Sequence, residues 1–228
     1  MSNPLRTRSF AAWLTRPKVF VVALILVVGG AYPAFSSPAR AVPDKRIPES
    51  TEKVISSTAI QALNALNQFM INGNQDSFDL YRVYANQLAI PIAGALGLDA
   101  NELQLSWARA DLPHQRALIA GLTQIGVPYR FNSSVAFKSF DCSGLTFYAW
   151  GVSGINVARS SAAQFYRARG INEKQAQPGD LVWRPGHVAL YLGVPGAVLQ
   201  APDRGRNVEI QLMNERISSW VRYADPLE

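Results

Sequence analysis

Cys142 is the only cysteine in the 228-residue chain, and its neighbours favour a chemical role. Asp141 is typical of a helix N-cap, and residues 143–150 have the apolar spacing of a helix. The sulfur would then lie in the first turn, where free N–H groups and the helix dipole favour a thiolate and can hold an oxyanion. A lone cysteine is more often a small buried hydrophobe, so the interpretation depends on its partners.

A base for this thiol would come from a sheet at the C-terminal end of the chain. From residue 178 onward apolar residues alternate, which predicts an antiparallel meander of strands at 180–183, 188–192, 197–200 and 208–212. His187 shares one strand face with Ala189 and Tyr191, and we expect this face to point toward the Cys142 helix. Gln200, on the neighbouring strand, would bind one imidazole nitrogen and leave the other free to deprotonate the thiol. The alternative is a histidine with a structural role only.

The rest of the chain supplies helices, so the predicted fold class is α+β, with helices packed on the meander. Helical spacing covers residues 50–72, 77–91, 98–110 and 160–166, and a further helix starts at Pro113 and is ended by Gly126. His114, in the first turn of that helix, is expected to be solvated and not to bind a metal. One cysteine and two histidines at these separations match no zinc-ligand spacing, so no metal site is predicted.

The net charge of +6 comes mostly from the first 41 residues, which hold five basic and no acidic side chains. A basic stretch to Lys18, an apolar run over 19–28 and a small-residue site at 39–41 predict a signal peptide cleaved before Val42. A retained membrane anchor is the alternative, because residues 19–35 approach the roughly 20 that a span needs. Either way we expect export, where an unpaired thiol indicates reactivity. The sequence has no cluster of basic and aromatic residues that would indicate nucleic-acid binding.

Residues 42–111 form a linker and a helical segment with five basic and eight acidic side chains, whereas residues 112–228 hold twelve and eight. Opposite net charges favour docking of the segment on the domain. We therefore expect the segment to fold against residues 112–228 and to cover their cleft. The alternative is a helical hairpin that only packs on the domain or spaces it from a membrane.

Five ordered blocks of sequence resemble one family. They are Gly-Val-Pro-Tyr at 126–129, Phe-Asp-Cys-Ser-Gly-Leu at 140–145, Pro-Gly-Asp-Leu-Val at 178–182, Gly-His-Val-Ala-Leu-Tyr-Leu-Gly at 186–193 and Gln-Ala-Pro at 200–202. Residues 112–228 thus resemble the NlpC and p60 family of bacterial cell-wall cysteine peptidases, most closely the secreted mycobacterial members. The resemblance implies a papain-like fold, no cofactor, and hydrolysis of peptidoglycan stem peptides, typically between D-isoglutamate and diaminopimelate.

By position, the resemblance makes Cys142 the nucleophile, His187 the base and Gln200 the third polar residue. It also places Tyr129 in the active site, with Asp141, Ser143, Arg159 and Ser160 near the substrate. The third residue is often a histidine or an acid in this family, and Gln200 predicts a weaker ion pair with the thiolate.

The expected role is wall remodelling or cell separation by a monomer in the cell wall or a periplasm-like space. The alternatives are a catalytically weak or inactive wall-binding domain, and an amidase or acyltransferase on the same scaffold.

Overall fold

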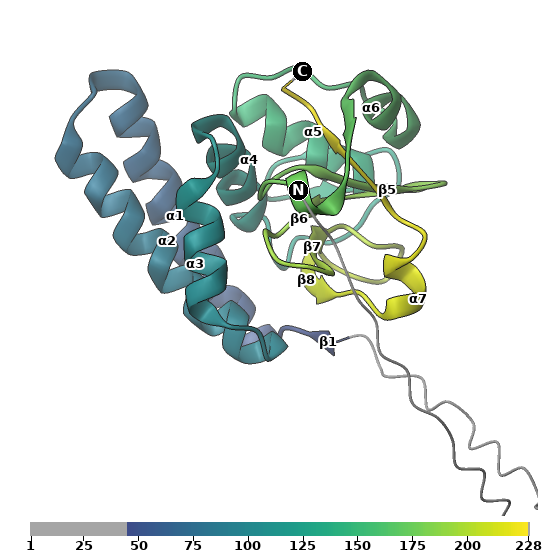
Figure 1. The fold of residues 1–228 in the computed structure, drawn as a ribbon, viewed down its shortest axis with the longest axis horizontal. Coiled ribbons are helices and arrows are strands. Elements are labelled where there is room, and N and C mark those ends of the chain that lie inside the picture. The colour runs from purple at the N-terminus through teal and green to yellow at the C-terminus, as the bar shows by residue number, and fades with distance from the viewer. Residues whose placement is uncertain (1–44, 228) are drawn as a thin grey trace, which may run out of the picture. The chain divides into compact units, whose positions relative to one another are not determined.

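The computed structural model describes residues 45–227, with side chains from Ile47 onward. The predicted signal peptide or anchor lies outside the described residues. None of the helices within 45–227 is both long and apolar enough to cross a membrane. The chain order (Figure 1) is β1 (Lys45–Arg46), α1 (Glu49–Asn72), α2 (Gln75–Leu96), α3 (Ala100–Arg109), α4 (Leu112–Leu122), β2 (Ser134–Val135), β3 (Ser139–Phe140), α5 (Cys142–Val152), α6 (Ser161–Arg167), β4 (Arg169–Ile171), η1 (Glu173–Gln175), β5 (Leu181–Arg184), β6 (His187–Tyr191), β7 (Ala197–Gln200), β8 (Glu209–Leu212), α7 (Glu215–Ser218) and β9 (Arg222–Asp225).

Helices α1, α2 and α3 form the predicted helical segment, and α1 packs along α2 (Figure 1). Gly73 and Gly97 take the left-handed conformation that ends α1 and α2, with φ of 67° and 69°. The sequence predicted that the second helix ends at Pro91, but α2 continues to Leu96. Ile92, Ala93 and Leu96 are all buried, and this packing outweighs the backbone hydrogen bond that a proline removes.

The sheet is antiparallel, in the order β1-β8-β7-β6-β5-β9-β4. The four consecutive strands β5 to β8 are the predicted meander, so the α+β fold class is confirmed. The outer strands β1, β9 and β4 were not predicted, because two to four residues carry little alternation. β2 and β3 pair separately and lead directly into α5.

The two faces of the sheet bury different clusters. Val188, Leu190 and Leu192 belong to the main core, which they share with α1 to α5. Ala189 and Tyr191 belong to a smaller cluster with Val182, Val198 and Tyr223. The expectation that Ala189 and Tyr191 face the helices is therefore wrong. The larger aliphatic side chains of β6 take the side against the helices, where burial of apolar area is greater.

The helical segment shares the main core with the domain. Ile55, Ala59 and Leu66 of α1 are buried there, and the indole nitrogen of Trp107 in α3 donates to the Leu192 carbonyl at 2.6 Å. That opposite net charges favour this docking stays a prediction, and one pair at the contact has like charges. Burial is the largest cause that raises the pKa of Glu52, and the like charge of Glu209 is the second.

His114 is fully buried, and the prediction of a solvated side chain is wrong. Its Nε2 lies 3.0 Å from Asp180 and 3.3 Å from Asp225, which are themselves almost completely buried. Among the described residues these three could offer metal-ligand atoms within 4.8 Å of one another. Asp180 already accepts a hydrogen bond from the backbone N–H of Gln177, and Asp225 forms an ion pair with Arg169. We interpret the cluster as a buried ionic network that joins α4, β5 and β9.

Candidate active site

Cys142 is the first residue of α5, as predicted, and its side chain is partly exposed. The Asp141 carboxylate caps the helix by accepting from the Gly144 amide at 2.6 Å. The backbone N–H groups of Val188, Ser143 and Cys142 lie near the sulfur and lower the pKa of its thiol. The sulfur therefore lies between the start of α5 and the first residues of β6.

Gly144 is required by a close approach of the preceding loop. A Cβ built on Gly144 would lie 1.9 Å from the Ser133 carbonyl oxygen, far inside van der Waals contact. That oxygen also accepts from the Asp141 amide at 2.9 Å and from Arg159 at 3.2 Å. The missing side chain at position 144 thus lets the 130–133 loop pack against the start of α5 and fix the nucleophile's position.

A cavity of about 320 Å³ opens at the sulfur. It is lined by all the residues that the sequence placed near the substrate, together with others, namely Tyr129, Phe131, Asn132, Asp141, Cys142, Ser143, Arg159, Ser160, Ser161 and Gly186. Arg159 donates to both carboxylate oxygens of Asp141, at 3.0 and 2.8 Å, and to the Ser143 hydroxyl at 3.0 Å. The ion pair leaves little net charge at the floor of this cavity, so it suits a polar but not strongly charged group.

Burial opposes the thiolate that the sequence predicted. Desolvation raises the pKa of the Cys142 thiol, and the Asp141 carboxylate adds to this. The three backbone N–H groups lower the pKa but do not reverse the net direction. The resting side chain is therefore a neutral thiol at neutral pH.

His187 and Gln200 lie together as the sequence predicted. His187 Nε2 is 2.8 Å from Gln200 Oε1, and the Gln200 amide in turn donates to Gln211 Oε1. Because Oε1 can only accept, Nε2 carries the proton and Nδ1 is left as the basic nitrogen. Gln211 fixes the orientation of Gln200, and sequence reasoning missed it. Gln211 could have been found from its position on β8, the strand next to β7.

Burial also decides the charge of His187. It lowers the pKa of the imidazole to about 4, against a smaller opposing effect of the hydrogen bond to Gln200. The nearby Arg184 guanidinium lowers it further. The pair of neutral thiol and neutral imidazole is thus the resting state across the neutral range.

Cys142 and His187 line two different cavities, which share no lining residue. Gly186 lines the cavity at the sulfur, whereas His187 and Gln200 line one of about 220 Å³ on the sheet face that carries the smaller cluster. The link between the two is the strand start itself, since the N–H of Val188 reaches the sulfur and the side chain of His187 precedes it.

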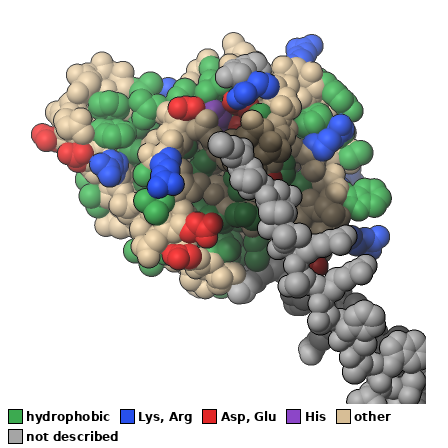
Figure 2. All heavy atoms as spheres, viewed as in Figure 1, with side chains coloured by type: hydrophobic (Ala, Val, Ile, Leu, Met, Phe, Trp, Pro, Cys, Tyr) green, Lys and Arg blue, Asp and Glu red, His purple; other side chains and the backbone are tan. Residues whose placement is uncertain are grey.

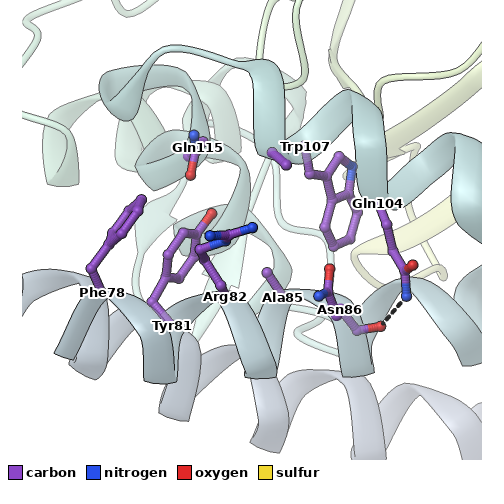
Figure 3. A pocket seen from close by; sticks show the side chains of 9 residues that line it. Phe78, Tyr81, Arg82, Ala85, Asn86, Gln104, Trp107 and Gln115 are labelled. Carbon is purple, nitrogen blue, oxygen red and sulfur yellow. Dashed lines mark hydrogen bonds between the residues drawn. The ribbon is translucent and has the colours of Figure 1, made fainter. Parts of the chain in front are cut away.

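Another cavity, of about 250 Å³, lies between α2, α3 and α4, where Tyr81, Arg82 and Trp107 line it (Figure 3). Gln104 donates to the Asn86 carbonyl at its rim. None of its lining residues lines either cavity at Cys142 or His187.

Comparison with known proteins gives a family for the C-terminal part. The NlpC/P60 family matches residues 126–223. Peptidoglycan endopeptidase RipB of Mycobacterium tuberculosis is 28% identical over 221 residues, which cover 87% of this chain and 88% of RipB. Peptidoglycan endopeptidase RipA of Mycolicibacterium smegmatis is 28% identical over 194 residues, or 78% of this chain and 38% of RipA.

The chain therefore spans less than half the length of RipA, but most of RipB. A crystal structure of an NlpC/P60 family protein from Bacillus cereus is 27% identical and has a TM-score of 0.46, covering 50% of this chain and 40% of that one. The family match includes Cys142, His187 and Gln200 and excludes α1 to α4. Residues 126–223 of this chain are thus similar to the NlpC/P60 family.

Proposed function

We propose that this protein is a peptidoglycan endopeptidase that cleaves stem peptides by cysteine nucleophilic catalysis, at the bond between D-isoglutamate and diaminopimelate. Its relatives RipA and RipB are named peptidoglycan endopeptidases, which supports the substrate class. The observation that carries the chemistry is a sulfur at a helix start, near the Val188 amide, together with a histidine directly before Val188 that Gln200 holds at 2.8 Å.

In this proposal the reaction starts from the neutral pair. Nδ1 of His187 takes the thiol proton as Sγ of Cys142 attacks the carbonyl carbon, and the N–H groups at the start of α5 stabilise the oxyanion. The imidazolium then gives its proton to the leaving amine, which departs as the C–N bond breaks. Water, deprotonated by His187, hydrolyses the thioester and restores the thiol. Gln200 keeps the imidazole oriented but offers no negative charge to stabilise the imidazolium.

The test is digestion of purified peptidoglycan by the protein starting at Val42 and by its Cys142→Ala variant, with products identified by mass spectrometry. Release of fragments that begin with diaminopimelate, by the parent protein only, supports the proposal. Products that differ in the cleaved bond correct the bond, and equal release by both proteins refutes the role of the thiol.

One observation favours a second candidate, a weak or inactive wall-binding domain. Burial raises the pKa of Cys142 and lowers that of His187, so the ion pair that activates many cysteine peptidases is disfavoured. Binding of the parent protein to insoluble peptidoglycan without any release of fragments would support this candidate. Both proposals place the protein at the cell wall, outside the cytoplasm.

A further inference from the structure

A further cavity borders the one that His187 lines. Arg184 pairs with His187 across β5 and β6, and both line the cavity of about 220 Å³. Arg184 and Ile217 also line a second, outer cavity of about 420 Å³. The two cavities thus share Arg184 and Ile217, and we treat them together as one groove that runs from His187 to α7.

The outer part of this groove combines positive charge with an exposed ring. It is lined by Arg184, Asn214, Arg216, Ile217 and Trp220, and no acidic side chain is among them. Arg184 and Arg216 are exposed, and in the part of the chain that the structure describes neither guanidinium has a hydrogen bond or an ion pair. Trp220 is 74% exposed, so its ring is accessible to a ligand in the groove. Figure 2 shows basic and hydrophobic side chains at the edge where β5 and α7 lie in Figure 1.

The chemistry of the proposed reaction says what this groove would face. The acyl part of the substrate stays on Cys142, so it occupies the cavity at the sulfur. The leaving amine must lie beside the imidazole that protonates it. The peptide that leaves therefore extends from His187 toward Arg184, and a stem peptide cut before diaminopimelate carries free carboxylates in that part.

We propose that Arg184, Arg216 and Trp220 form the subsite for the leaving peptide and bind a carboxylate on it. This inference rests on the proposed function for the direction of the peptide. Two unpaired guanidinium groups recognise a carboxylate by charge and by hydrogen bonds, and the indole covers the apolar stem of the same residue. The subsite selects peptides that are acidic after the cleaved bond.

The test measures binding in the Cys142→Ala background, so it does not depend on turnover. The probe is the dipeptide diaminopimelyl-D-alanine, with free carboxylates or with both carboxylates amidated, titrated calorimetrically. We expect the free dipeptide to bind about tenfold more tightly than the amidated one, as hydrogen bonds from charged, exposed groups allow. Arg184→Gln and Arg216→Gln should each remove most of this difference.

Arg109→Gln is the matched control, because Arg109 is also exposed but lies in α3 and lines neither cavity of the groove. It should bind both dipeptides as the background protein does. Equal binding of the free and amidated dipeptides would overturn the inference, as would loss of the difference in Arg109→Gln. Failure of the parent protein to cut peptidoglycan would refute the proposed function. The binding difference between the two dipeptides would still test the subsite, because its measurement does not depend on turnover.

Discussion

Replacement of Gln200 by glutamate tests whether burial and a neutral partner set the charge of His187. Gln200 Oε1 accepts from His187 Nε2 at 2.8 Å, and both side chains are buried. A carboxylate at that distance stabilises the imidazolium, and an opposite charge in such a site raises a histidine pKa by about 1–3 units. The pKa of His187 should therefore rise from about 4 to roughly 5–7, a change of roughly 1.4–4 kcal/mol in the relative stability of the charged form.

The direct assay is an NMR titration of the histidine rings, which the chain makes simple because it has two histidines. The acid limb of kcat/KM should move to higher pH by the same amount, since the free enzyme needs a neutral His187. Gln104→Glu is the control, because it makes the same chemical change in α3, away from both cavities at the site. An unchanged or lower pKa of His187 in Gln200→Glu would refute the conclusion that a neutral partner keeps the imidazole uncharged.

Three further outcomes are expected. Gly144→Ala should lower the free energy of unfolding by about 1–3 kcal/mol, because its Cβ meets the Ser133 carbonyl oxygen at 1.9 Å. Gly151→Ala, in the same helix but with open space around it, should be neutral or stabilising. Thermal unfolding of both variants measures the difference. His114→Ala should cost about 3–5 kcal/mol in denaturant unfolding, because two buried carboxylates lose their shared partner; a loss below about 1 kcal/mol would contradict the ionic network. The lowered pKa of His187 means that the unfolded chain binds more protons between pH 6.5 and about 4, so stability should fall by about 3 kcal/mol as the pH is lowered across that window, and this slope should be absent in His187→Gln.

The elements that the sequence predicted well are those with a strong local signal. Asp141 and Ser160 cap α5 and α6 as their residue types indicate, and the meander follows from alternation bounded by glycine and proline. The contact of His187 with Gln200 follows from adjacent strands. These features depend on residues close in sequence or on one pairing rule, so local patterns suffice.

The features that the sequence did not predict depend on contacts between distant segments. Burial of His114 requires two carboxylates, 66 and 111 residues further along the chain, to meet at the start of α4. The face of β6 that carries His187 depends on which side the helices take, and alternation alone fixes only which residues share a face. The pKa of Cys142 was expected to fall near a helix start, but the depth of burial decides its direction.

The core that α1 to α3 share with the sheet has a consequence for how this protein can be recombined. The blocks of sequence that resemble the family would by themselves suggest that the chain from Leu112 onward is a portable module. A junction placed there would leave the carbonyls of Leu192 and Gly193 without their donors from α3, and the apolar side of α4 open to water. A chimera that keeps the chain from Ile47 onward preserves these contacts, so the useful boundary for grafting lies some 65 residues before the one that similarity suggests.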